Sequence, residues 1–164
     1  MHLQNLYMHI PMNAPGQPKK TLRRDAATLI EACPGWNTRL ATRRISHFLD
    51  RELAETRLTT AQIGLMAQIA VASDDTLGAL AQRTGLDQST LSRNLRTLEG
   101  EDLIEIAVVG TDLRRRMVWL TEAGAHRLEA AIPIWRRAQA KLAKLVSPAL
   151  ARHLAEETEA LMSP

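Results

Sequence analysis

Arginine and hydroxyl side chains share one face of the segment 88–99. At the 100° spacing of an α-helix, its leucines form a stripe on the opposite side. One guanidinium group can form two hydrogen bonds to a guanine, at O6 and N7, and hydroxyl groups near a helix N-terminus can contact phosphates. The pattern predicts a DNA recognition helix, and a solvated amphipathic helix with incidental arginines is the simpler alternative. The leucines are Leu91, Leu95 and Leu98, and the candidate DNA-binding residues are Ser89, Thr90, Arg93, Arg96 and Thr97.

A second candidate site consists of the consecutive arginines Arg114, Arg115 and Arg116. They lie in and beside a Gly-Thr-Asp loop between two β-rich runs, 103–109 and 116–120, which predict a hairpin. Adjacent like charges repel each other and gain little from surface ion pairs unless a polyanion neutralises them. A hairpin that reaches into the minor groove of DNA would use them in this way. The alternative is a solubilising hairpin tip.

Two short helices are predicted to position the first site. The apolar periods of 77–84 and 88–99 flank a turn in which Gly85 allows a tight reversal and Asp87 can cap the second helix. This order predicts a helix-turn-helix unit.

Longer helices are predicted on both sides of this unit. Thr59 and Gln62 match a capping box ahead of an apolar helix, and Thr121 can cap a long helix in which Pro133 is expected to introduce a kink. The apolar faces of the terminal helices exceed what one small lobe can cover, so we expect two subunits to intertwine. The predicted fold is mainly α with a small β-hairpin wing: a winged helix-turn-helix with long terminal dimerisation helices. We expect a flexible arm over 1–20, dimerisation helices over 21–56 (21–32 and 36–55), a DNA-binding lobe over 57–120 and dimerisation helices over 121–164.

Composition argues against several other functions. The chain has 164 residues, 3% aromatic residues and a net charge of +3, values that favour a helical domain and permit a nucleic-acid partner. The longest apolar stretch, 63–72, is too short for a membrane span and no signal-peptide pattern opens the chain, so we expect a cytoplasmic protein without membrane contact. The histidines and the single cysteine lack metal-ligand spacing, and no phosphate loop or nucleophile motif occurs. We therefore expect no metal, no cofactor and no enzymatic activity.

The wing carries the most specific motif of the chain. Asp112, Arg114 and the pair Leu120-Thr121 follow the helix pair at a defined distance. With them, the chain resembles the MarR (multiple antibiotic resistance regulator) family over about residues 36–160. The resemblance implies a homodimeric repressor or activator in which the first and last helices form the dimer interface, Arg114 enters the minor groove and Asp112 helps to hold the wing. The further matching residues are Leu80-Ala81, Gly85-Leu86, Ser89 to Arg93, Leu98-Glu99, Leu103-Ile104 and Gly124.

Two positions depart from the family's pattern. Asp102 stands where the family has a glycine before the Leu-Ile pair, and Ile106 stands where it often has an arginine. The first departure concerns the geometry of a turn, and the second concerns a phosphate contact.

Cys33, Trp36, Arg39, Arg43 and His47 form the candidate effector or redox site. Cationic neighbours or a helix N-terminus can depress the pKa of a thiol, and the organic hydroperoxide regulators of the family carry a reactive cysteine near this region. A small aromatic anion could instead lie against Trp36 and pair with an arginine. The alternatives are an inert thiol and a solvated basic face that contacts flanking DNA phosphates.

These patterns predict a homodimeric, sequence-specific, DNA-binding transcription regulator, and more narrowly a repressor that a small-molecule or oxidant signal releases. Its expected partners are double-stranded DNA, a second copy of the chain and a small aromatic or oxidant effector. The alternative is a winged-helix module that binds proteins without specific DNA binding. A thiol peroxidase that uses Cys33 is a more distant alternative.

Overall fold

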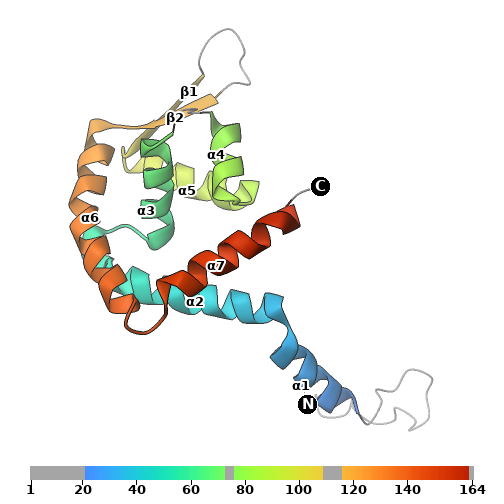
Figure 1. The fold of residues 1–164 in the computed structure, drawn as a ribbon. Coiled ribbons are helices and arrows are strands. Elements are labelled where there is room, and N and C mark those ends of the chain that lie inside the picture. Colours follow the sequence, from blue (N-terminus) through green and yellow to red (C-terminus); the bar gives the residue numbers. More distant parts are fainter. Residues whose placement is uncertain (1–20, 73–75, 109–115, 163–164) are drawn as a thin grey trace, which may run out of the picture. The chain divides into compact units, whose positions relative to one another are not determined.

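The computed structural model describes residues 21–72, 76–108 and 116–162, and most of these residues are helical (Figure 1). The chain divides into two compact units, the first ending at Thr42 and the second beginning at Arg43. The strands β1 (Ile104–Val108) and β2 (Arg116–Leu120) form an antiparallel hairpin, so the predicted mainly α fold with a hairpin wing is confirmed. The helices are α1 (Leu22–Ala32), α2 (Pro34–Glu52), η1 (Ala54–Thr56), α3 (Thr60–Ala70), α4 (Leu77–Thr84), α5 (Gln88–Gly100), α6 (Glu122–Leu142), α7 (Pro148–Thr158) and η2 (Glu159–Met162).

The first unit contains α1 and the beginning of α2. Pro34 is the first residue of α2, where its fixed φ suits the first turn and its missing N–H leaves no helical hydrogen bond unmade. The expected start near Trp36 was therefore too late. The Asn37 side chain donates to the carbonyl oxygen of Glu31 at 2.9 Å, which links the two helices across Cys33. No residue of α1 is buried.

Helix α2 ends at Glu52, before the predicted end at residue 55. The side chain of a buried threonine forms hydrogen bonds with the backbone groups that follow. The Thr56 hydroxyl donates to the carbonyl oxygen of Leu53 at 2.7 Å and accepts from the Leu58 N–H at 3.0 Å. Such side-chain bonds compete with helical ones and favour turns. The chain forms the short helix η1 and then passes through Arg57, whose φ is +58°.

Helix α3 begins with the predicted capping box. The Gln62 N–H donates to the Thr59 hydroxyl at 3.2 Å, and the Thr59 N–H donates to the Gln62 side-chain oxygen at 2.8 Å. Asp50, near the end of α2, accepts a further hydrogen bond from the Thr60 N–H at 2.7 Å. The free N–H groups of the first turn of α3 are thus bonded partly by its own residues and partly by α2.

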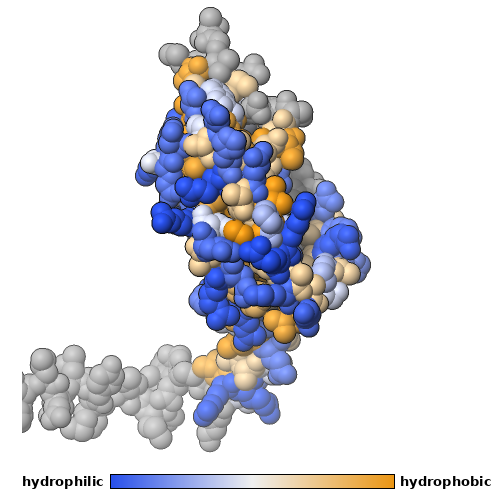
Figure 2. Space-filling model, turned by 90° about the vertical axis from the view of Figure 1, so that its left-hand side faces the viewer, coloured by the Kyte–Doolittle hydropathy of each residue, from blue (hydrophilic) through white to orange (hydrophobic). Residues whose placement is uncertain are grey.

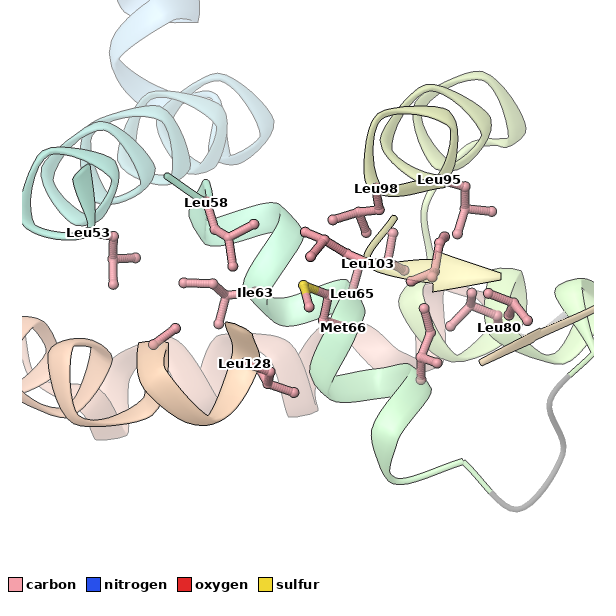
Figure 3. Close-up of a cluster of buried hydrophobic side chains, with 14 of the residues drawn as sticks. Leu53, Leu58, Ile63, Leu65, Met66, Leu80, Leu95, Leu98, Leu103 and Leu128 are labelled. Carbon is pink, nitrogen blue, oxygen red and sulfur yellow. The ribbon is translucent and has the colours of Figure 1, made fainter. Parts of the chain in front are cut away.

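The core of the second unit is built around α3, which contacts α4, α5, α6 and β2. Figure 3 shows leucines of α5 and α6 and of the chain before β1 converging on Met66 and its neighbours in α3. The helix-turn-helix therefore shares one core with the hairpin and with α6. The fully buried large side chains are Leu53, Met66, Leu80, Leu98, Leu103, Ile104 and Val118.

A close backbone approach joins the hairpin to α6. The Thr121 hydroxyl donates to the carbonyl oxygen of Asp102 at 2.6 Å and accepts from the Gly124 N–H at 2.9 Å, which confirms Thr121 as the N-cap of α6. A Cβ atom on Gly124 would lie 1.8 Å from the carbonyl oxygen of Leu103. Asp102 has a φ of +58°, in the left-handed region where glycine is least strained. This conformation accounts for a glycine at this position in the family's pattern, and aspartate is among the residues that tolerate it.

Candidate nucleic-acid interface

The turn between α4 and α5 has the predicted geometry. The Thr76 hydroxyl caps α4 by accepting from the Ala79 N–H at 3.2 Å. Gly85 ends the helix with a φ of +61°, and its N–H donates to the carbonyl oxygen of Ala81 at 3.1 Å. Glycine adopts this conformation without a Cβ penalty, so α5 can start directly after the turn.

Asp87 caps α5 and engages the hydroxyls beside it. Its carboxylate accepts from the Ser89 hydroxyl at 2.6 Å, the Thr90 N–H at 2.8 Å and the Thr90 hydroxyl at 2.8 Å. These bonds, that from Ser89 first, lower the pKa of Asp87 to about 2. Both hydroxyl groups donate their protons to Asp87. Ser89 and Thr90 can therefore accept hydrogen bonds from a ligand but cannot donate one.

The two faces of α5 differ as its period predicted. Leu91, Leu95 and Leu98 are buried, which confirms the leucine stripe. Among the residues that the structure describes, no ion pair engages Arg93 or Arg96. The exposed face therefore carries two guanidinium groups free to bind an external acceptor. Of the candidate residues, Ser89, Arg93, Arg96 and Thr97 are exposed and Thr90 is half-buried.

A groove of about 520 Å³ runs between α4, α5 and the hairpin. Arg96 and Glu99 line it from α5, and Arg116 lines it from the start of β2. The sequence interpretation missed Gln88 and Ser92, which also line this groove. Their spacing was the available signal, since residues 88, 92 and 96 follow one another at four-residue intervals along one helix face.

The wing is described only in part. Asp112, Arg114 and Arg115 lie outside the described residues, whereas Arg116 is exposed and pairs with Val108 in the hairpin. Ile106, at the position where the family often has an arginine, lines the groove instead of presenting a charge.

The candidate effector residues fall into two groups. Cys33 is half-buried at the junction of α1 and α2, and Trp36 and Arg39 are exposed in the first unit. Arg43 and His47 are exposed in the second unit. Cys33 precedes α2 and the other four residues lie along it, so the effector site stays a prediction.

Metal binding and membrane insertion find no support among the described residues. No group of three histidine, cysteine, aspartate or glutamate residues in this part of the chain is placed to hold a metal ion. None of the described helices combines the length and the apolar composition that crossing a bilayer requires. His126 and His153 instead lie beside glutamates of their own helices, 3.4 Å from Glu129 and 3.1 Å from Glu157.

Comparisons with known proteins match the chain to MarR-family transcriptional regulators. The family model described as MarR family matches residues 58–115. The M. tuberculosis transcriptional regulator MosR, solved in complex with DNA, is 32% identical, with 79% of this chain and 96% of that chain covered and a TM-score of 0.70. The S. aureus MepR–DNA complex is 24% identical, covers 80% and 98%, and has a TM-score of 0.63. A mutant E. coli MarR bound to operator DNA is 21% identical, covers 82% and 98%, and has a TM-score of 0.68. No curated protein sequence matches the chain significantly.

Proposed function

The chain belongs to the MarR family of DNA-binding transcription regulators, and on this premise we propose that it is a homodimeric repressor of a pseudopalindromic operator. The observation that carries the proposal is the exposed face of α5, where Arg93 and Arg96 have no ion-pair partner among the described residues while the leucines behind them are buried. The relative at 32% identity was solved in complex with DNA. We propose that it acts in the cytoplasm, where such a regulator would meet chromosomal DNA.

Each candidate residue of α5 has a proposed role in DNA binding. Arg93 and Arg96 contact base edges in the major groove, where one guanidinium can form two hydrogen bonds to a guanine. Ser89 and Thr90 accept hydrogen bonds from base amino groups, since their own protons are held by Asp87. The Thr97 hydroxyl donates to the carbonyl oxygen of Arg93 at 3.1 Å, so it too would act on DNA as an acceptor. Arg114, Arg115 and Arg116 place the wing in the minor groove, and Asp112 supports it.

Exposed apolar residues of the C-terminal segment support the dimer. No residue of α7 is buried, and Leu150 and Leu154 are 64% and 43% exposed. Trp135 of α6 and Leu145 are exposed as well. A twofold interface that covers the terminal helices would remove this apolar surface from water, which is the main driving force of obligate dimers.

A signal is proposed to release the repressor from DNA. The candidate sensors remain Cys33 for an oxidant, and Trp36, Arg39, Arg43 and His47 for a small aromatic anion. Either signal must favour the conformer that does not bind DNA, because a ligand with equal affinity for both states shifts nothing. The test compares operator affinity of wild type and Cys33→Ser with and without an organic hydroperoxide, and then with aromatic carboxylates. Release by peroxide that persists in Cys33→Ser would remove the thiol from the mechanism.

The central experiment is footprinting combined with a salt titration. A dimer should protect two half-sites centred about 34 Å apart, one helical turn of DNA. Affinity should fall steeply with salt because counterions leave the DNA when arginines neutralise its phosphates. Protection of a single half-site by a monomer, or a shallow salt dependence with equal affinity for random DNA, would favour the winged-helix protein-binding module instead.

A further inference from the structure

Helix α5 carries a second row of polar side chains beside the row that contains Arg93. Gln88, Ser92 and Arg96 follow one another at four-residue intervals, and all three are exposed and line the groove between α4, α5 and the hairpin. Figure 2 views the α6 side of the second unit and shows hydrophilic side chains over most of it, so an exposed polar surface alone does not mark a DNA contact. The hydrogen-bonding chemistry of each side chain is what distinguishes the row in the groove.

Gln88 is the first residue of α5. Residues at the N-terminal end of a recognition helix are the ones that contact base edges. Among the residues that the structure describes, no hydrogen bond engages the Gln88 amide, whereas Asn94, the other amide of α5, is half-buried and donates to the carbonyl oxygen of Thr90 at 3.0 Å. Gln88 therefore combines the position nearest the bases with an amide that is available to a ligand.

The other exposed side chains of α5 offer less than an amide does. Ser89 donates its proton to Asp87 and can only accept, while a guanidinium can only donate. The Ser92 hydroxyl can donate and accept, but through a single oxygen atom. Helix α5 lies wholly within the described residues, and of its exposed side chains only Gln88 carries a donor and an acceptor on separate atoms.

This arrangement of donor and acceptor is complementary to adenine. In the major groove, adenine presents the acceptor N7 beside the donor N6 amino group. We propose that Gln88 selects an adenine in each half-site of the operator: its amide nitrogen donates to N7, and its amide oxygen accepts from the N6 amino group. The inference rests on the proposed function, which assigns DNA binding to α5 but no base to Gln88.

The first test selects preferred sequences from a library of randomised DNA duplexes, with the full chain as the binding protein. Wild type should select an adenine at one position of each half-site. Gln88→Ala should accept all four bases there and keep the rest of the selected sequence, and its affinity for the wild-type sequence should fall about tenfold because two hydrogen bonds to one base are lost. Gln88→Glu has nearly the same shape and should also lose the preference, since a carboxylate cannot donate to N7.

Gln82→Ala is the matched control. Gln82 is an exposed glutamine of α4 that does not line the groove. This variant should select the same sequence as wild type, and thermal unfolding checks that every variant folds. A substitution that only weakened the fold would lower the affinity for all sequences and leave the base preference unchanged.

The second test replaces the selected adenine with base analogues and measures operator affinity by fluorescence anisotropy. 7-Deazaadenine lacks the N7 acceptor, and unsubstituted purine lacks the amino group. Wild type should bind each modified operator several-fold more weakly than the unmodified one. Gln88→Ala should bind all three operators equally, because it has no contact left to lose.

A preference that survives in Gln88→Ala, or a lost preference for a base other than adenine, would overturn the role of Gln88. Equal effects of the analogues on wild type and on Gln88→Ala would overturn it as well. An evenly lower affinity of Gln88→Ala for every sequence would assign Gln88 to a phosphate and not to a base. A wild-type chain that selects no sequence would instead refute the proposed function, so the two failures are distinguishable.

Discussion

The recognition helix α5 and the terminal helix α7 show opposite relations to the rest of the chain. Both begin with recognisable signals, Asp87 before α5 and Ser147-Pro148 before α7. Helix α5 buries its leucine stripe in the core of its own chain, whereas α7 buries no residue. The comparison shows that local signals start a helix in either setting, and that burial within the same chain is what distinguishes α5 from α7.

The largest effect is expected on the free energy of dimerisation, when the proposed contact of α7 with the second subunit is disrupted. Replacing Leu150 and Leu154 together by glutamate should weaken dimerisation by about 3–6 kcal/mol per subunit, because each buried leucine contributes about 1.5–3 kcal/mol. Sedimentation equilibrium measures the change. The control is Arg152→Glu, which adds negative charge on the polar face of α7 and should leave the dimer intact. An equal change of the dimer affinity in the double leucine variant and in Arg152→Glu would mean that the leucines face solvent in the dimer.

The next effect concerns the self-contained lobe. Gly124→Ala should destabilise the protein by about 3 kcal/mol, because the new Cβ would clash with the Leu103 carbonyl oxygen and force the backbone to shift. Gly64→Ala, in α3 with no atom within 4 Å of its Cβ, should stabilise it by about 0.5–1 kcal/mol. Urea unfolding measures both, and a similar loss in the two variants would contradict the close approach.

The outer face of α5 can be tested without disturbing the core. Arg93→Ala should cost about 1–3 kcal/mol at the cognate operator and relax sequence preference, because a lost paired base contact no longer discriminates between bases. Arg136→Ala, an exposed arginine of α6, should change neither quantity. Fluorescence anisotropy on cognate and random DNA gives both affinities. Equal losses on the two DNAs would assign Arg93 to phosphate contact.

A smaller gain is expected where the chain departs from the family's pattern. Asp102→Gly should stabilise the lobe by about 1 kcal/mol, because glycine adopts the positive φ without the Cβ penalty. Differential scanning calorimetry would show the higher midpoint. A lower midpoint would mean that the aspartate side chain itself stabilises the turn.

The smallest effect at neutral pH is expected for Asp87→Asn, since asparagine also caps helices well. The difference should appear in acid. The pKa of Asp87 is lowered from 3.8 to about 2 in the folded chain, so its ionised form stabilises the fold above about pH 4 and this contribution is lost as pH falls toward 2. Wild type should therefore lose stability relative to Asp87→Asn over this range, as measured by urea unfolding at each pH. Parallel pH profiles would show that the cap does not titrate as described.

Much of the fold could be predicted because its signals are local. The capping box at Thr59, the turn at Gly85 and the leucine stripe of α5 each involve residues within a few positions of one another, so the sequence spacing already fixes their geometry. The same holds for the exposed face that carries Arg93 and Arg96. Its contacts with DNA, and the roles of the wing arginines, stay predictions.

The sequence by itself determined where most helices begin, which face of α5 is apolar and which face carries its arginines. Only the tertiary structure decided that Gly124 must lack a side chain, because the carbonyl oxygen that would meet its Cβ belongs to Leu103, just before β1. It also decided that the segment after α2 lies against the arginines of α6, whose partners are more than 70 positions away in the chain. Helical periodicity orders neighbours along one element, whereas such contacts depend on how separate elements pack, and no local spacing encodes that packing.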